Sequence, residues 1–506
     1  MKKRIALLLA AAFMIFPAAG CGQQDITDNT HNPPQNIARA NETAGPDSTQ
    51  NAGMPSIVPE TVNPEDAGDA VTLDGSVTTI ALGETIGISG GGAAANGGTV
   101  SITAAGNYSV SGTLADGRIV INSDGATINL ELAGADITNP AGPAVYVADA
   151  KQVNILLKEG TVNSLTDGSS YSDVKLKAAL FSEDPLTIRG NGTLNVTGKY
   201  KHGIASDDTL TVEGGNINVK SAVTDGLHAN DDVTIDGGIL SITAESDGIE
   251  SELTANINAG TLKIDAGDDG VHADTELVIN GGNICITRSY EGLEGKTKVT
   301  INSGGIRLKC DDDSINAGED LVINGGYIYA DCEGDGLDSN GNMTVNGGTT
   351  VIFSGNNANG PIDVGDRNGT CTINGGTVIA AGGNMGISVS EGSKQHSMWI
   401  ASRAAANTLV NISGQGGELA TFSMLKEASL IFYTSDKLTA NASYEIKTGG
   451  SHSGEAVDGV YNGGSYSGGS SLGSVAMSAK SVSLGNAGGM GGWKDFGRGE
   501  GGRRPQ

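Results

Sequence analysis

A repeat of about 22 residues runs through the middle of the chain and constrains the fold more than any other feature. Each unit opens with alternating apolar and polar residues, a glycine pair follows, and successive units begin at Leu277, Val299, Leu321 and Met343. A unit this short cannot bury its apolar face alone, so it gains stability by stacking on its neighbours. The sequence therefore predicts an all-β fold, a right-handed parallel β-helix in which each repeat forms one rung.

Three short apolar runs in each unit predict three strands separated by three turns. Equivalent apolar residues of successive rungs should then stack at the spacing between strands, about 4.8 Å. We expect Ile301 to contact Ile323, and Ile315 to contact Leu337. The repeat region has room for roughly 13 such rungs.

The composition fits short strands and tight turns, since the chain has 79 glycines and only 4% aromatic residues. Its formal net charge of -28 repels polyanions and excludes nucleic acid as a partner. For the same reason an acidic ligand would need a bridging cation. We expect a monomer.

The N-terminus has the features of a bacterial lipoprotein signal. Basic residues precede an apolar stretch from Ile5 to Ala19, which is shorter than the roughly 20 residues needed to span a bilayer. The stretch ends in Ala18-Ala19-Gly20-Cys21, which resembles a lipobox with Cys21 as the lipidated residue. The sequence thus predicts an extracellular protein anchored to the cell membrane through lipid only. The alternative is ordinary signal cleavage and release.

Composition also divides the rest of the chain. The segment after Cys21 is rich in proline and lacks aromatic residues, which predicts a disordered tether. The ends of a β-helix need caps, because an exposed end offers unpaired strand edges, and the irregular stretches 71–130 and 395–485 are the candidates. The predicted parts are a signal peptide at 1–20, a disordered tether at 21–70, the β-helix at 71–395, a C-terminal β region at 396–484 and a glycine-rich disordered tail at 485–506.

A motif of an acid, a small residue, an aliphatic residue and a polar residue recurs in step with the repeat, and the small residue is glycine except at Ser314. If the aliphatic residue points into the core, the first and fourth residues form two parallel columns along one edge. We call these two columns the acid ladder. The first column contains Asp225, Asp247, Asp269, Glu291, Asp313 and Asp335. The fourth-position column contains His228, Glu250, His272, Glu294, Asn316 and Asp338.

The acid ladder predicts a bound divalent cation. Carboxylates about 4.8 Å apart repel one another unless a cation lies between them. Calcium accepts irregular cages of roughly six to eight oxygens more readily than magnesium does. The alternative is that Asp-Gly is a favoured turn pair, with the acids solvated at a corner. The predicted calcium ligands are Asp225, Asp247, Glu250, Asp269, Glu291, Glu294, Asp313, Asn316, Asp335 and Asp338.

Four short segments match a known family. They are GNYSVSGTL from Gly106, GPAVYV from Gly142, ALFS from Ala179 leading into LTI from Leu186, and YEGLEGK from Tyr290. On these segments the chain resembles the clostridial-type surface carbohydrate-binding β-helix proteins, which are distantly related to family 9 pectate lyases. The resemblance implies calcium binding and attachment to a plant-type polysaccharide.

The two histidines of the ladder are two rungs apart. His228 and His272 would lie about 10 Å from each other, with Glu250 between them, so they would not share one ion of a softer metal. We predict instead that they hydrogen-bond to the neighbouring acids or to sugar hydroxyls.

Three functions remain open. We favour calcium-dependent binding of an acidic polysaccharide such as polygalacturonate. In the lyase alternative, calcium acidifies a sugar proton and a lysine or arginine removes it, although no residue is assigned as catalytic. In the third alternative the rod is a structural or adhesin stalk. The predicted ligand-binding residues are His228, His272, Lys296, Arg307 and Lys309.

Two cysteines fall at the same offset of adjacent rungs. Cys310 and Cys332 would be within reach of a disulfide at the spacing between strands. Stacked buried free thiols are the alternative, since free cysteine is a common core residue.

Overall fold

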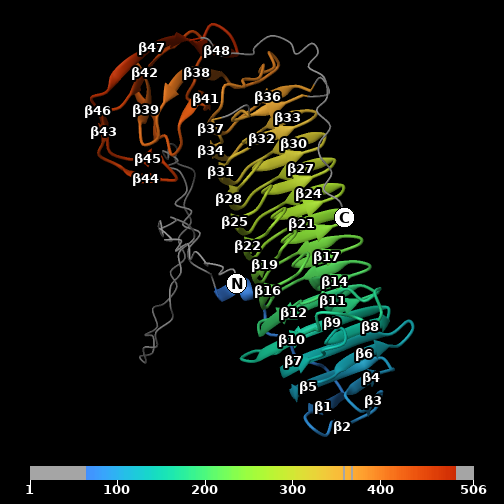
Figure 1. The fold of residues 1–506 in the computed structure, drawn as a ribbon. Coiled ribbons are helices and arrows are strands. Elements are labelled where there is room, and N and C mark those ends of the chain that lie inside the picture. The colour runs from blue at the N-terminus through green and yellow to red at the C-terminus, as the bar shows by residue number, and fades with distance from the viewer. Residues whose placement is uncertain (1–63, 357–358, 366–368, 486–506) are drawn as a thin grey trace, which may run out of the picture. The chain divides into compact units, whose positions relative to one another are not determined.

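The structure is a computed structural model that describes residues 64–356, 359–365 and 369–485. Within these residues the chain forms a β-solenoid of about 11 turns with ~23 residues per rung, and antiparallel sheets follow near the C-terminus (Figure 1). The predicted parallel β-helix is therefore confirmed. The predicted signal peptide, Cys21 and nearly all of the predicted tether and tail lie outside the described residues. No helix in the described part of the chain is long and apolar enough to cross a membrane.

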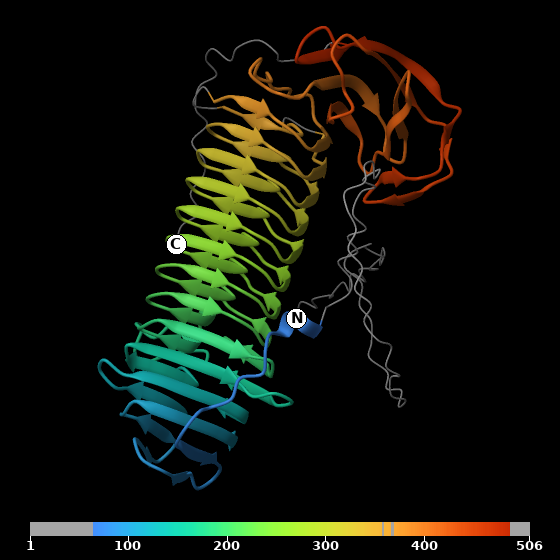
Figure 2. The same ribbon diagram turned by 180° about the vertical axis from the view of Figure 1, so that it is seen from behind.

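Each regular rung contains three short strands, and each strand pairs in parallel with the strand three places further along the chain. The solenoid therefore has three sheet faces. Figure 2 shows the stack of rungs from behind. We call the face with the 13-stranded sheet the ladder face, because it carries the acidic motif. Its strands are β3 (Ala93–Asn96), β4 (Thr99–Ile102), β6 (Arg118–Asn122), β8 (Val145–Asp149), β11 (Ala178–Ser182), β14 (His202–Ser206), β17 (Leu227–Ala229), β20 (Ile249–Ser251), β23 (Val271–Ala273), β26 (Leu293–Gly295), β29 (Ile315–Ala317), β32 (Leu337–Ser339) and β35 (Asp363–Val364).

The second and third faces follow the ladder face in each rung. The second face consists of β1 (Val77–Leu82), β5 (Gly106–Leu114), β7 (Thr127–Thr138), β9 (Gln152–Leu157), β12 (Leu186–Gly190), β15 (Leu210–Val212), β18 (Val233–Ile235), β21 (Thr254–Ile257), β24 (Glu276–Ile279), β27 (Lys298–Ile301), β30 (Asp320–Ile323), β33 (Met343–Val345) and β36 (Cys371–Ile373). The third face consists of β10 (Val162–Thr166), β13 (Thr193–Thr197), β16 (Asn216–Ser221), β19 (Ile239–Thr243), β22 (Thr261–Asp265), β25 (Asn283–Arg288), β28 (Gly305–Cys310), β31 (Tyr327–Cys332), β34 (Thr349–Phe353) and β37 (Thr377–Gly382).

The core consists of apolar columns that run from rung to rung. Buried residues alternate with partly exposed ones along strands such as β27 and β30. Ile301 is the register partner of Ile323, and Ile315 is the register partner of Leu337, as predicted. All four side chains are fully buried. Each of them therefore packs on its own equivalent in the next rung.

The rung length is constant only in the regular middle of the solenoid. Longer rungs occur where Val145 pairs with Leu180 and where Met343 pairs with Cys371, because each pair encloses an insertion. The solenoid has about 11 turns, fewer than the roughly 13 expected from the regular repeat.

Glycine recurs in the rungs for two different reasons. At one corner Gly282 and Gly304 have φ angles of 83° and 106°, which residues with a side chain adopt at a cost. The glycines of the acidic motif have no positive φ. A Cβ on Gly248 would lie 2.3 Å from Cγ2 of Ile264 and 2.6 Å from the carbonyl oxygen of Gly270. The motif therefore requires glycine because the next rung lies so close.

An asparagine ladder runs along the exposed corner after the second face. The side-chain amide of each residue donates to Oδ1 of its equivalent in the preceding rung, at 2.7 to 2.8 Å. Because an amide has both donors and an acceptor, identical residues can satisfy one another when stacked. These donors are Asn280, Asn302, Asn324 and Asn346, and Asn258 is the first acceptor. Asn374 continues the ladder by donating to Oδ1 of Asn346 at 2.9 Å.

Antiparallel strands close both ends of the solenoid. At the N-terminal end, β2 (Gly87–Ser89) pairs with β1, and β3 pairs with β4. At the C-terminal end, β41 (Ala428–Thr434) pairs with β37. These strands cover edges that would otherwise be open to pairing with another chain.

The end of the predicted tether is ordered, which corrects the prediction for these residues. Pro64–Ala67 forms a short 3-10 helix, η1. The carbonyl oxygens of Asp66 and Ala67 accept hydrogen bonds from the backbone N–H groups of Gly238 and Gly215. Composition favours disorder here, but the glycine corners leave the backbone accessible, so the segment docks on the solenoid.

The C-terminal β region pairs with the last rung and packs on the third face. Phe422 and Tyr433 share one apolar cluster with Phe353 and Ile379 of the solenoid. Besides β41, the strands of this region are β38 (Ser397–Ala404), β39 (Leu409–Gly414), β40 (Gly417–Ser423), β42 (Ser443–Thr448), β43 (Ser451–His452), β44 (Glu455–Val457), β45 (Val460–Asn462), β46 (Tyr466–Ser467), β47 (Ser470–Ala476) and β48 (Ser481–Leu484).

The two stacked cysteines are free thiols in the core. Cys310 and Cys332 are register partners on β28 and β31, and both are buried. The two cysteines therefore form no disulfide with each other and are stacked buried thiols, which was the alternative prediction.

We expect Ile323→Asp to prevent folding, because it places a carboxylate in an apolar column with nothing to replace its lost hydration. Ile323 is fully buried between Ile301 and Val345. Circular dichroism should show the loss of the β-sheet signal, the result expected when a substitution costs more than about 4 kcal/mol. The matched control is Val322→Asp, because Val322 is partly exposed and alternates to the outer side of β30. Equal effects of the two substitutions would contradict this register.

Candidate functional site

The acid ladder lies on the ladder face and the turn before it. The fourth residue of each motif is the middle residue of a three-residue strand, as Glu250 is in β20 and Glu294 in β26. Register pairing stacks these residues in one column, where Glu250 is the partner of His272 and His272 is the partner of Glu294. The first residue of each motif lies two positions before its strand, so the two columns run side by side.

The first column is buried more deeply than a solvated turn. Asp225, Asp247 and Asp269 are only 3%, 8% and 7% exposed. A carboxylate at this depth loses most of its hydration, which costs free energy unless the group is paired or hydrogen-bonded. The alternative that these three acids are solvated turn residues is therefore wrong.

Backbone hydrogen bonds engage one oxygen of several first-column acids. Oδ1 of Asp225 accepts from the N–H of Asp247 at 3.3 Å, and Oδ1 of Asp247 accepts from the N–H of Asp269 at 2.8 Å. The same bond recurs between Asp313 and the N–H of Asp335 at 2.5 Å. Each of these acids thus ties its rung to the next one through one oxygen.

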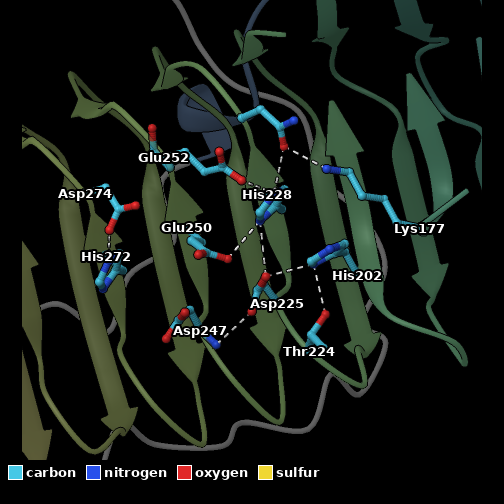
Figure 3. Close-up of polar contacts among 12 residues, drawn as sticks. Lys177, His202, Thr224, Asp225, His228, Asp247, Glu250, Glu252, His272 and Asp274 are labelled. Carbon is cyan, nitrogen blue, oxygen red and sulfur yellow. Dashed lines mark hydrogen bonds and ion pairs between the residues drawn. The ribbon is translucent and has the colours of Figure 1, made fainter. Parts of the chain in front are cut away.

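His228 bridges the carboxylates of two rungs. Its Nδ1 lies 3.3 Å from Oδ2 of Asp225 and 2.8 Å from Oε2 of Glu250 (Figure 3). Burial alone lowers the pKa of His228, but the hydrogen bonds to the two carboxylates raise it to about 9. Burial alone raises the pKa of Asp225, yet its hydrogen bonds with His202 and His228 hold that pKa well below its usual range. His228 therefore carries positive charge between two negative groups.

His272 repeats this arrangement two rungs further along. Its Nδ1 lies 2.8 Å from Oδ2 of Asp269 and 2.6 Å from Oε2 of Glu294. Burial opposes the charged form, but these carboxylates raise the pKa of His272 to about 11. Its Nε2 lies 3.2 Å from Oδ1 of Asp274 and 3.1 Å from Nζ of Lys296. The prediction that the two ladder histidines hydrogen-bond to neighbouring acids is confirmed.

His202 extends the first column by one rung, although the regular repeat did not predict it. Its Nδ1 lies 2.8 Å from Oδ2 of Asp225 and 2.9 Å from Oγ1 of Thr224. Its ring stacks on that of His228, with centroids 4.3 Å apart. The sequence signal that could have found it is His202-Gly203 followed by an aliphatic residue, which matches the motif with histidine in place of the acid. This rung is longer than the regular repeat, so His202 does not fall at the 22-residue spacing.

Asp363 extends the fourth-position column at the other end, and it was also missed. It is the register partner of Asp338 and follows the buried Ile362, as the motif requires. An insertion before β35 shifts it out of the regular register. An aliphatic-acid pair shortly after Gly360 was the signal that could have found it.

The C-terminal part of the ladder contains oxygen ligands only. We call it the oxygen-only end. Burial, and then the charge of Glu294, raise the pKa of Glu291 to about 8. Burial raises the pKa of Asp313 to about 7 with help from neighbouring carboxylates, Asp335 first, and against one backbone hydrogen bond. The charged groups that act most on Glu291 and Asp313 are all carboxylates. The members of this end are Glu291, Glu294, Asp313, Asn316, Asp335 and Asp338.

Asn316 is exceptional among these residues. Its Nδ2 donates to Oε2 of Glu291 at 2.9 Å. Its Oδ1 is buried and has no hydrogen-bond partner among the described residues. In the column, Asn316 stands between Glu294 and Asp338. Neither neighbour in the column donates a hydrogen bond to this oxygen, so the arrangement suits a cation ligand.

Three groups of described side chains bring possible ligand atoms within 4.8 Å of one another and could hold a metal ion. Five of the predicted calcium ligands and both predicted histidines take part in them. The groups are His202 with Asp225 and His228, Asp225 with Asp247 and Glu250, and Asp269 with His272 and Glu294.

Arg307 and Lys309 do not reach the ladder. Both lie on β28 of the third face. There Arg307 pairs with Asp458 of the C-terminal β region and lies over the ring of Tyr327. Packing of that region on the third face thus accounts for the position of Arg307. Of the three predicted basic residues, Lys296 is the one beside the ladder.

Without metal, stability should fall as the pH rises from about 4 to 8. Burial, and then the charges of Asp269 and Asp225, raise the pKa of Asp247 from 3.8 to about 8. An acid whose pKa is higher in the folded state binds its proton more tightly there, so the folded state loses stability between the unfolded and folded pKa values. Thermal denaturation in chelator should show this decline.

The control for this prediction is Asp247→Asn, which keeps an oxygen to accept from the N–H of Asp269. The variant should show a shallower decline in melting temperature over the same pH range. A decline as steep as that of the wild type would mean that Asp247 ionises freely in the folded protein.

Comparisons with known proteins cover the region that carries the ladder. Residues 96–358, more than half of the chain, match a family described as "Carbohydrate-binding domain-containing protein". A relative with the same description from Acetivibrio thermocellus is 39% identical over 127 residues, which are 24% of this chain and 44% of the relative. The chain thus spans less than half the length of that relative. A solved structure of a polysaccharide lyase-like protein from C. thermocellum, a gadolinium derivative, is 30% identical, covers 52% of this chain and 96% of its own, and has a TM-score of 0.39.

Proposed function

Because the chain belongs to the carbohydrate-binding domain family, we propose that it binds a polysaccharide on the ladder face. The proposed ligand is an acidic polymer such as polygalacturonate, and the proposed bridge is calcium at the oxygen-only end. The observation that carries this proposal is the buried, unpartnered Oδ1 of Asn316 in a column between two acids. The proposed location is the cell surface, with Cys21 as the lipid anchor.

The residues at the oxygen-only end fit a hard cation. Their side chains offer carboxylate oxygens and one amide oxygen, which is the donor set that calcium prefers. The raised pKa values of Glu291 and Asp313 reflect burial and repulsion, and a cation nearby would offset both effects. Calcium, when bound, would supply the positive charge that an acidic polymer needs to approach a chain of net charge -28.

The exposure of the fourth-position column also suits a cation that bridges the protein and a polysaccharide. Glu294, Asn316 and Asp338 are partly exposed, unlike the buried acids at the start of the first column. A cation held there would keep coordination positions on the solvent side. The carboxylates and hydroxyls of a uronic acid polymer would complete its coordination.

Polygalacturonate should be retained by the immobilised full-length protein in millimolar calcium and released by chelator. The double variant Glu291→Gln/Asp313→Asn should lower the retention by about tenfold or more, because it removes two of the charges that hold the cation. Affinity chromatography or a sedimentation assay on a panel of polysaccharides would measure this.

The matched control is Glu213→Gln/Glu276→Gln, which removes the same charge from residues away from the ladder face. This variant should retain polygalacturonate as the wild type does. Retention that survives chelator, or that favours neutral cellulose, would refute the calcium bridge. A protein that calcium stabilises but that retains no polysaccharide would favour the stalk alternative.

The lyase alternative needs a neutral base beside the ladder, and Lys296 is held as a cation. Burial alone lowers the pKa of Lys296, but the charges of Glu294 and Asp274 raise it overall. Its Nζ lies 3.3 Å from Oδ1 of Asp274. A general base works best when its pKa lies near the operating pH. We therefore propose binding without elimination.

Incubation with polygalacturonate and calcium should give no unsaturated product, measured as ultraviolet absorbance over time. This follows from the protonated state of Lys296. A rise in absorbance that Lys296→Ala abolishes would establish the lyase alternative. Chelated wild-type protein is the control for light scattering by the polymer.

A further inference from the structure

The N-terminal end of the ladder differs in chemistry from the oxygen-only end. His202, Asp225 and His228 converge there, and their ligand atoms lie within 4.8 Å of one another (Figure 3). We propose that this cluster binds a transition metal ion of the zinc class. The ligands are Nδ1 of His202, Nδ1 of His228 and Oδ2 of Asp225, and Glu250 supplies a fourth from the next rung. This site is separate from the proposed calcium site, which uses neither histidine.

The distances between these atoms are close to those of a tetrahedral site. Oδ2 of Asp225 lies 2.8 Å from Nδ1 of His202 and 3.3 Å from Nδ1 of His228. Oε2 of Glu250 lies 2.8 Å from Nδ1 of His228. Zinc bonds of about 2.0 to 2.1 Å in a tetrahedron put the ligand atoms about 3.3 Å apart. The closest ligand atoms thus need to move apart by about half an ångström when the ion binds.

The donor types select against calcium at this end. Calcium takes oxygen ligands, whereas imidazole nitrogen suits zinc and its neighbours in the first transition row. Two imidazoles with one or two carboxylates form a set that zinc uses in proteins. The Oγ1 of Thr224, 2.9 Å from Nδ1 of His202, is close enough to supply a further oxygen.

Neighbouring side chains hold the ligands in the orientation that metal binding requires. Nε2 of His228 lies 3.2 Å from Oδ1 of Asn230, which also accepts from Nζ of Lys177 at 2.7 Å. The Nε2–H donated in this way fixes the ring with Nδ1 toward the ion, and such outer partners are typical of protein metal sites. Binding releases the Nδ1 proton that His228 shares with Asp225 and Glu250 in the metal-free protein, because a histidine ligand must be deprotonated. The backbone N–H of Asp247 holds Oδ1 of Asp225, so Oδ2 faces the histidines.

The cluster around His272 differs from this one in two respects. It contains one imidazole, and Nζ of Lys296 lies 3.1 Å from Nε2 of that ring. A lysine ammonium at this position opposes a second cation. His272 is therefore the natural control, because it has the same residue type, face and column as His228.

The test uses the full-length chain without a histidine tag, freed of metal by chelator. Zinc is titrated in competition with a chromophoric indicator, and cobalt(II) is added separately as a spectroscopic probe. We expect one tight zinc site per chain and the intense visible absorption of tetrahedral cobalt(II). Excess calcium should not displace the zinc. Weak absorption typical of octahedral cobalt(II), or zinc that calcium displaces, would overturn the proposal without any variant.

Substitutions then locate the ion. His202→Gln should weaken zinc binding by about tenfold or more, and His272→Gln should leave it unchanged. Circular dichroism of each variant checks that the solenoid is intact. Equal effects of the two substitutions, or no effect of His202→Gln, would overturn the proposal. Polygalacturonate retention in calcium is measured on the same variants, so a failure of the zinc site is distinguishable from a failure of the proposed function.

Discussion

Parallel stacking in register places each side chain on its own equivalent in the next rung, and the rest of the structure depends on this constraint. Apolar residues meet it by packing, as Ile301 packs on Ile323. Amides meet it by mutual hydrogen bonding, as Asn302 does with Asn280. Stacked carboxylates can do neither, because they repel each other and have no hydrogen to donate. An acidic column can therefore persist in a solenoid only where other groups supply donors or positive charge.

The ladder meets this demand differently along its length. Backbone N–H groups of the next rung satisfy one oxygen of acids such as Asp247. In the fourth-position column a histidine alternates with a glutamate, so that His228 and His272 neutralise the acids around them from within. The alternation stops at Asn316, where a third histidine would have followed. The columns of the oxygen-only end therefore contain no cationic side chain to offset the charge of their acids, and the unpartnered amide oxygen lies there.

The regular repeat was sufficient to predict the fold, the core contacts and the two columns, because these follow from spacing alone. It could not predict His202 or Asp363, since insertions before and after the regular rungs shift both out of register. The depth of Asp247 depends on how the turns of adjacent rungs pack, which a single repeat unit does not encode. The pairing of Arg307 with Asp458 joins residues far apart in the chain, and no local sequence pattern predicts it.

Burial separates the roles that the two ends of the ladder can take. The side chains of His202, Asp225 and His228 are 10%, 4% and 7% exposed, so a polymer cannot reach an ion among them. An ion at that depth would join the ladder-face strands β14, β17 and β20 and would act on stability. At the oxygen-only end the column of Glu294, Asn316 and Asp338 is partly exposed, and a cation there remains accessible to a ligand. The same stacking constraint thus gives two kinds of position. An ion among the buried histidines would stabilise the fold, and an ion in the partly exposed column would also be able to bind a ligand.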